Sequence, residues 1–392
     1  MKNNRVIWPF VIFMLVFLNF FRPYGIDDNF WKSAYYFCIF LSVIYTLLKW
    51  NYIKTKGWLC LLYSLFLVEL LLSTFGSVIF QNQSWKVSLI TSLGFIVYSF
   101  YFFLQCKSYN VQSLERSMNV LSLFFAFCFV VAFLVYPIQI FRGYGISDEI
   151  LSDRGMQRIR LTIMGGAPIY FTFFYAISKV KQSVSKKWML ILIACFCLVV
   201  LQLGRMSIAL TFALGTFYYL SNRKWYYKVF VIAFFFFSIS NYAIKIPVIN
   251  QLVVYSQEHE GDSDEDNVRV LSFEYYTTKY SERLGSKLIG NGMYSIGNSD
   301  YGNSVNYARS LGLIPADVGY AFIFLIFGFV GLGLYACLLL YCLWVKIPIQ
   351  YVNLKYYLVF LYLSNVSGNT LLGCIPYICV VSYIIDKVRT KI

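Results

Sequence analysis

The sequence has little charge. Charged residues make up 13% of its 392 residues, whereas soluble domains typically reach about a quarter. Hydrophobic residues make up 59% of the chain and the mean hydropathy is +0.64, so the sequence argues against a soluble enzyme and indicates an integral membrane protein. The net charge of +15 lies in the connections between apolar runs, which fits a membrane protein better than a nucleic-acid-binding one.

Residue types that metal binding and catalysis often use are scarce as well. The only histidine, His259, lies in an acidic run, and the ten cysteines all lie in or beside apolar runs without a CxxC. Neither a zinc site nor a Ser-His-Asp set is therefore expected. The sequence has no Walker loop, and Gly-Asn-Gly at 290–292 lacks the setting of a dinucleotide site. We predict no metal, no cofactor and no partner nucleic acid.

What the sequence has is long apolar runs. A spanning helix needs about 20 apolar residues, and the chain offers such runs repeatedly. We predict an all-α fold: a polytopic helical bundle of about 12 transmembrane helices, forming a single domain over residues 1–392. Gly-Gly-Ala-Pro at 165–168 predicts either a break within the sixth helix or an ordinary proline kink. The predicted spans are 6–21, 30–48, 58–80, 87–105, 118–140, 162–178, 188–204, 206–221, 229–243, 317–344, 354–367 and 370–385.

One large polar loop, residues 244–316, separates the ninth and tenth predicted spans. Alternate connections differ in charge: one set holds 19 of the 33 Lys and Arg and two acids, whereas the set that includes this loop holds 14 basic residues and 15 acids. Short loops rich in Lys and Arg stay in the cytoplasm. Both termini are therefore predicted to be cytoplasmic, and the large loop is predicted to face outward.

The outward connections are also rich in arginine. They hold nine Arg and five Lys, against four Arg and 15 Lys on the inner side. The planar guanidinium binds phosphate or carboxylate oxygens bidentately, whereas Lys offers a point charge. The bias indicates an external ligand that carries such groups; chance, or ion pairs with the acidic outer loops, is the alternative. Arg205 lies between two spans with no room for a loop, which places it at the outer interface.

The large loop contains recurrent glycine and tyrosine motifs. After Arg269 the pattern predicts a helix over 270–284 with Gly285 as its cap. Ile-Gly-Asn-Gly follows at 289–292, then a Tyr- and Asn-rich stretch, Asp-Val-Gly-Tyr at 317–320 and Phe-Gly-x-x-Gly at 327–331. Tyrosine rings and amides suit sugar hydroxyls, so the loop is a candidate glycan-binding segment.

These motifs, in this order and together with Leu-Gly-Arg-Met-Ser at 203–207, resemble the Wzy-type O-antigen polymerases over roughly residues 140–335. The resemblance implies an enzyme of the bacterial cell inner membrane. It would join undecaprenyl-pyrophosphate-linked oligosaccharide repeats by glycosyl transfer at the periplasmic face, with a chain-length regulator as a further partner. O-antigen ligases share the Arg-bearing segment but carry a histidine near the helix after the loop, where this chain has Asp317 and Tyr320.

The resemblance also assigns roles. Such a transfer needs positive charge on the departing pyrophosphate and a carboxylate that takes the hydroxyl proton. Asp317 is the predicted base, with Glu282 as the second candidate. The candidate pyrophosphate ligands are Arg142, Arg158, Arg160, Arg205, Arg269 and Arg283. The candidate glycan-binding residues are Tyr294, Tyr301, Arg309 and Tyr320.

Three other functions stay open at this point. The first is an O-antigen or teichoic-acid ligase, which would differ in its acceptor. The second is a lipid-linked glycan flippase or another transporter, although such proteins usually have similar halves and none are visible here. The third is a structural membrane subunit, for which the external arginines would be incidental.

Overall fold

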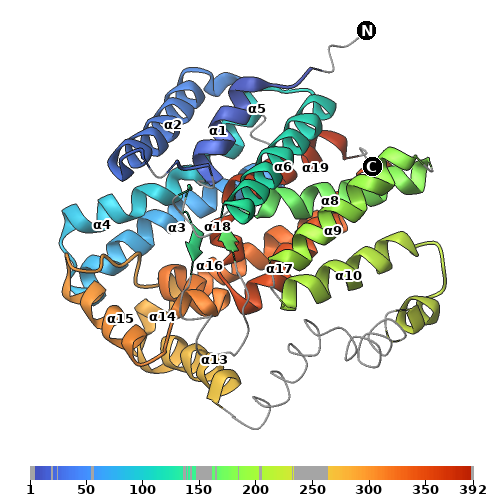
Figure 1. Ribbon diagram of the computed structural model, residues 1–392. Helices are drawn as coiled ribbons and strands as arrows, with labels where there is room; N and C mark the ends of the chain where they lie inside the picture. Colours follow the sequence, from blue (N-terminus) through green and yellow to red (C-terminus); the bar gives the residue numbers. More distant parts are fainter. Residues whose placement is uncertain are drawn as a thin grey trace.

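The protein is a helical membrane protein (Figure 1). Its computed structural model describes residues 5–18, 21–23, 25–53, 57–135, 138, 140–141, 144–146, 161–163, 166–183, 185–202, 205–231, 233 and 264–389. Among these residues, five helices are long and apolar enough to cross a membrane, and two further apolar helices are shorter. The five are Asp28–Leu48, Trp58–Gln81, Trp85–Lys107, Val111–Leu134 and Gly319–Trp344.

The helices in the first half of the chain lie at the predicted spans, although the bounds of α6 and α8 differ from the prediction. One predicted span is made of three consecutive pieces, α4, η2 and α5. The bounds are α1 (Trp8–Leu18), α2 (Asp28–Leu48), η1 (Trp50–Tyr52), α3 (Trp58–Gln81), α4 (Trp85–Ser92), η2 (Leu93–Ser99), α5 (Phe100–Lys107), α6 (Val111–Leu134), α8 (Ala167–Gln182), α9 (Lys186–Leu201) and α10 (Arg205–Tyr219).

The second half contains the helices of the large loop and then the last long helices. Its bounds are α13 (Asp264–Glu274), the π-helical turn η4 (Tyr275–Lys279), α14 (Leu284–Ile289), α15 (Asp300–Ser310), η5 (Pro315–Asp317), α16 (Gly319–Trp344), η6 (Ile349–Tyr351), α17 (Val352–Ser364), η7 (Asn365–Ser367), α18 (Thr370–Gly373) and α19 (Ile375–Val388).

Aromatic side chains fill the interior of the bundle. Phe17 packs edge-on against Phe100, and Tyr63 stacks on Tyr101 with ring centroids 4.3 Å apart. All four are buried. Stacked and edge-on ring pairs add about 0.5–1.5 kcal/mol each beyond the area that they bury. The high aromatic content of the sequence therefore serves packing between helices as well as the membrane interfaces.

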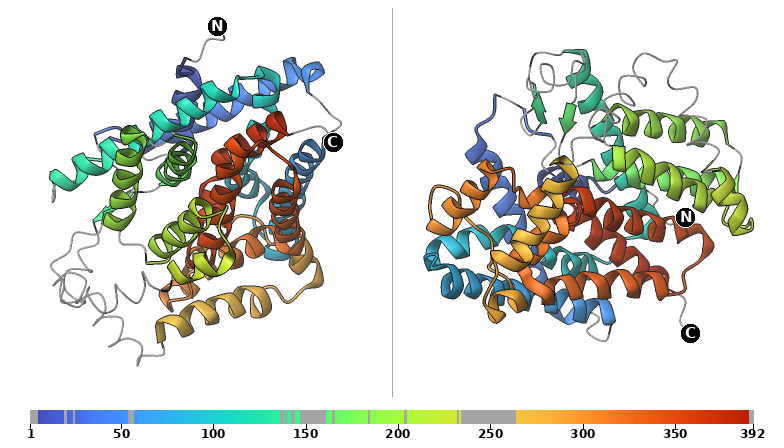
Figure 2. Two further views of the ribbon diagram at one scale, coloured as in Figure 1. Left: turned by 90° about the vertical axis from the view of Figure 1, so that its right-hand side faces the viewer. Right: turned by 90° about the horizontal axis from the view of Figure 1, so that it is seen from below.

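The two chain ends lie at the same end of the bundle, and the large loop lies at the other. Near the N-terminus, the Ile7 amide donates to Ser117, and near the C-terminus, Lys387 donates to Ser108; the two acceptors flank the start of α6. At the opposite end, Gln81, the last residue of α3, donates to Asn291 of the loop at 2.8 Å. Helix α13 lies crosswise below the bundle (Figure 2, left).

Helix α16 is broken at Gly328, and the loop fills the break. Gly328 has φ 60° and ψ −159°, which no helix tolerates, so the carbonyls of Leu325 and Ile326 lose their partners one turn later. The amides of Asn291 and Gly292 replace those partners, at 2.8 and 3.0 Å. Ile-Gly-Asn-Gly and Phe-Gly-x-x-Gly, which lie about 40 residues apart in the chain, thus form one junction.

Several predicted boundaries were wrong, each for a local reason. Pro168 does not break a helix; it lies in the first turn of α8, where its missing N–H costs no hydrogen bond. Upstream of it, residues 161–163 form a short strand, β2 (Leu161–Ile163), antiparallel to β1 (Tyr144–Ile146), a pair that the all-α prediction omitted. Helix α6 begins at Val111, seven positions before the predicted 118, because Asn110 caps it by accepting from the Gln112 amide.

The helix predicted over 270–284 is also different. Helix α13 ends at Glu274 and continues as the π-helical turn to Lys279. Gly285 is not its cap but lies inside α14, where a side chain would collide with the ring of Phe80. Most of the predicted ninth span, 229–243, lies outside the described residues, as does His259. The number of about 12 spans stays a prediction.

Candidate functional site

The described part of the large loop is a folded cap built around tyrosines. The Tyr276, Tyr280, Tyr294 and Tyr301 rings contact one another or share a neighbour, with centroids 5.6–6.1 Å apart. Three of their hydroxyls are used internally. Tyr276 donates to the Leu313 carbonyl at 2.9 Å, Tyr301 donates to the Gly292 carbonyl at 2.9 Å, and Tyr280 bonds Ser304 at 2.8 Å.

Burial keeps these phenols protonated. It raises the pKa of Tyr280 to about 12, and the pKa values of Tyr276 and Tyr301 are also raised by burial. The cluster therefore holds the loop together as a set of neutral hydrogen-bond donors and ring contacts.

Asp317, the predicted base, lies at the junction between this cap and α16. It ends the turn η5, and its amide donates to the Ile314 carbonyl. Its carboxylate does not cap the helix, because the N-cap residue of α16 is Val318 and no side chain makes a cap hydrogen bond there. The structural role that an aspartate often has at a helix start is thus absent at Asp317.

The positive charges of two arginines act on Asp317. Asp317 is solvent-exposed, but the protein packed around its carboxyl still raises its pKa above the ordinary value by desolvation, and the positive charges of Arg269 and Arg309 act in the opposite direction. Arg309 also lowers the pKa of Tyr294, which burial raises. Arg269 comes from α13 and Arg309 from α15, and both side chains are exposed. The fold therefore brings together four predicted site residues: Asp317, Arg269, Arg309 and Tyr294.

The other predicted loop residues lie elsewhere. Tyr301 is 2% exposed, so its ring faces protein and not solvent. Tyr320 is half-buried and donates to the Tyr362 carbonyl at 2.8 Å. Glu282 and Arg283 are exposed on the segment between η4 and α14, and among the described residues neither contributes to the electrostatic environment of Asp317.

Four predicted pyrophosphate ligands are only partly placed or not placed at all. Arg142, Arg158 and Arg160 lie outside the described residues. Arg205 is the first residue of α10, so its backbone position is known although its side chain is not described. Gln202 and Ser207, which flank it in the chain, both line one cavity in the described part of the molecule.

This cavity has a volume of about 800 Å³ and lies beside Asp317. Its wall includes Ala316, the residue that precedes Asp317, and Asn369 and Thr370 at the start of α18. Two cations, Arg22 and Lys32, line it from the α1–α2 connection and from α2. Tyr170 and several apolar side chains from α1, α8 and α17 complete the lining. The cavity thus combines cationic and apolar walls, as a phosphorylated lipid would require.

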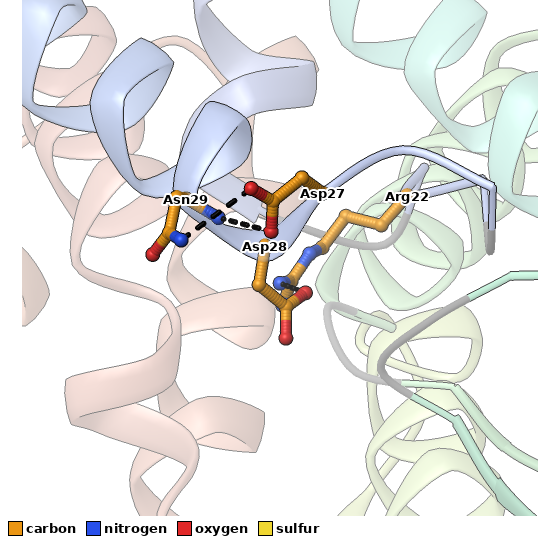
Figure 3. A network of polar contacts seen from close by, with 4 residues as sticks. All are labelled: Arg22, Asp27, Asp28 and Asn29. Carbon is orange, nitrogen blue, oxygen red and sulfur yellow. Dashed lines mark hydrogen bonds and ion pairs between the residues drawn. The ribbon is translucent and has the colours of Figure 1, made fainter.

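An ion pair between Arg22 and Asp28 holds Arg22 in this wall (Figure 3). Its guanidinium bonds the Asp28 carboxylate at 2.5 Å, and the Arg22 side chain is 15% exposed. The neighbouring Asp27 accepts from the amide and side chain of Asn29 and thereby caps α2. The arginine position is therefore fixed by the start of α2.

The residues that line the cavity hold unsatisfied polar atoms. Arg22 Nε, Trp31 Nε1, Gln202 Nε2 and Asn369 Oδ1 are buried and have no hydrogen-bond partner among the described residues. An unpaired buried polar group costs about 1–3 kcal/mol, and native structures contain few of them. Three donors and one acceptor are thus enclosed within the wall of this cavity.

Sequence reasoning did not select these residues. Arg22 was one of the nine outward arginines. Its position directly after the first apolar run, ahead of Pro23, Asp27 and Asp28, is the sequence feature that could have identified it. Lys32, Gln202 and Asn369 carry no comparable signal, because only the packing of α2, α9 and α18 brings them together.

Comparison with known proteins adds no identification: no protein-family model, no curated protein and no solved structure matches the chain.

Proposed function

We propose that the protein is a polysaccharide polymerase that joins lipid-pyrophosphate-linked oligosaccharide repeats on the outer face of the bacterial inner membrane. The observation that carries the proposal is the 800 Å³ cavity with Arg22 and Lys32 in its wall, which Ala316, the residue directly before Asp317, also lines. The predicted orientation, with the large loop outside, supports it, because a lipid-linked donor presents its sugar at that surface.

The chemistry needs no nucleotide. A hydroxyl oxygen of the acceptor repeat forms a bond to the anomeric carbon of the donor while the bond from that carbon to the pyrophosphate oxygen breaks. The hydroxyl proton passes to the Asp317 carboxylate, and the electron pair leaves with the lipid pyrophosphate. Cations near the departing group would stabilise its charge, and we propose Arg205 and the cavity residues Arg22 and Lys32 for this role.

We propose that the residues around Asp317 bind the acceptor repeat and control the ionisation of Asp317. Arg269 and Arg309 moderate the rise in its pKa that desolvation causes, so the carboxyl can be ionised and still accept a proton. Tyr294, half-buried beside Arg309, offers a ring edge and a hydroxyl at the same place. Amphipathic rings of this kind suit sugar faces.

Glycan length on cells tests this function. Deleting the gene should leave cells with single repeats on their lipid anchor, and the wild-type gene should restore long chains. A ligase would instead leave no glycan on the final acceptor, and a flippase would trap repeats on the cytoplasmic side. Either of these patterns, or normal chain lengths in the deletion strain, would contradict polymerisation.

A further inference from the structure

A second, smaller cavity lies at the opposite end of the bundle, near the two chain termini. It has a volume of about 250 Å³ and is formed where the start of α6, the end of α8 and the turn η6 meet. Cavities for drug-sized ligands usually measure about 300–1,000 Å³. The ligand that fits here is therefore a small group and not a whole sugar repeat. The proposed polymerase chemistry does not use this cavity.

A nearly buried carboxylate opens into this cavity. Glu115 is 5% exposed, and no hydrogen bond or close ion pair of its carboxylate exists among the described residues. Glu115 lines the cavity, and Lys179 in the same lining acts on it electrostatically. A buried charge without a partner is costly, which makes Glu115 a group that a ligand would satisfy.

Two cations and two phenols share the lining with Glu115. Lys179 stands over the Tyr175 ring, with its ammonium 4.9 Å from the ring centroid, and is close enough to act electrostatically on Glu115. Arg116 and Tyr351 line the same space. The cavity thus contains one negative and two positive side chains around an aromatic wall.

The charge pattern restricts the ligand. A simple anion would leave Glu115 without a hydrogen-bond donor, and a simple cation would be repelled by Arg116 and Lys179. A small molecule with both an ammonium and a phosphate satisfies both halves: the ammonium donates to Glu115, and the phosphate faces the two cations. The position of the cavity at a bundle end, beside the first turns of a spanning helix, is that of a lipid headgroup.

We infer that this cavity binds a phosphoethanolamine group, presented by a phospholipid of the leaflet opposite the large loop. The ligand must carry a primary ammonium because the N–H groups of that ammonium can donate hydrogen bonds to Glu115. A quaternary choline has no N–H group, so it leaves the carboxylate without a hydrogen bond although the charge is the same.

Binding of short-chain lipids to the purified full-length protein in detergent tests the inference. Dioctanoyl phosphatidylethanolamine should bind about tenfold more tightly than the phosphatidylcholine or phosphatidylglycerol of the same chain length. Glu115→Gln should remove this preference, and Lys179→Gln should weaken phosphatidylethanolamine binding several-fold. Lys186→Gln makes the same charge change at the same bundle end, outside the cavity lining, and should leave binding unchanged.

Equal affinity for the three lipids, or an unchanged preference in Glu115→Gln, would overturn the assignment. The thermal unfolding midpoint of each variant shows that it is folded. Lys179 is only half-buried, so Lys179→Gln keeps the test decisive if Glu115→Gln does not fold. Competition by soluble glycerophosphoethanolamine shows whether the bound group comes from a phospholipid or from a soluble metabolite. If the soluble compound competes as strongly as the lipid, the ligand is a soluble metabolite. If it does not compete, the ligand is a phospholipid of the bilayer.

Discussion

At the scale of single residues, the central feature is the carboxylate of Asp317, which has no structural role as a helix cap or in an ion pair among the described residues. Asp317 neither caps α16 nor forms an ion pair within 4 Å among the described residues, and its surroundings push its pKa in opposing directions. Sequence position alone suggested it, because it is the carboxylate at the start of the helix after the loop. The proximity of Arg269 and Arg309 could not have been predicted, since it depends on how α13 and α15 fold back.

Replacing Arg205 or Arg269 by Lys tests the role of the guanidinium. Lysine keeps the charge but loses the planar fork, so polymer should fall about tenfold or more in each variant, while the protein level in the membrane stays normal. Chain lengths are measured on gels of extracted glycan. Arg223→Lys, an exposed position away from the cavity, is the matched control. Wild-type chain lengths in both variants would leave these arginines with only a solvated role.

The pH dependence of polymerisation tests the electrostatic setting of Asp317. Desolvation raises its pKa and Arg309 lowers it, so Arg309→Gln should raise the pKa further. Because only the ionised carboxylate accepts a proton, the acid limb of the normalised rate profile should move to higher pH, by about half to one pH unit. Lys279→Gln removes a charge from the same loop and should not move the limb. A shift to lower pH would contradict the assignment.

At the scale of elements, the break in α16 is the feature that organises the loop. Gly290, Gly292 and Gly328 all have positive φ, and side chains at Gly290 or Gly328 would overlap the backbone of the other segment. Asn291 is fully buried and links this junction to Gln81 and Ser281. The short glycine motifs therefore have a structural cause, which holds whether or not the loop is catalytic.

Gly328→Ala tests this junction. The backbone conformation at Gly328 is essentially restricted to glycine, so alanine should cost about 1–3 kcal/mol and lower the thermal unfolding midpoint of the purified protein. Gly333→Ala is the matched control in the same helix, because a methyl group there meets nothing within 4 Å. That variant should unfold at the wild-type temperature or slightly above. Equal midpoints for both variants would remove the structural role of the break.

Much of the element pattern was predictable from hydrophobic runs. The helices α2, α3 and α16 begin and end within a few residues of the predicted spans. What failed depended on local chemistry: a proline that begins α8, an Asn cap that starts α6 early, and a helix that breaks at Gly328. The last could not be predicted, because glycine is common in membrane helices and only the docking loop segment makes this one break.

At the scale of the whole molecule, the bundle has two distinct ends. One carries the folded loop, Asp317 and the larger cavity, and the other carries both termini and the smaller cavity. The charge distribution of the sequence predicts that these ends lie on opposite sides of the membrane. Alkaline phosphatase fused after Asn303 should be active and a fusion after Lys186 inactive, and the reverse pattern would place the proposed site on the wrong side.

The most direct test of the central claim uses purified protein in lipid vesicles with a lipid-pyrophosphate-linked repeat as the only substrate. The proposed function predicts products of two, three and more repeats, with one lipid pyrophosphate released for each bond formed and no requirement for nucleotide. Asp317→Asn should reduce the rate by about a hundredfold or more, whereas the exposed Glu274→Gln on the same cap should not. Absence of elongation by the wild-type protein, or a wild-type rate from folded Asp317→Asn, would contradict the account.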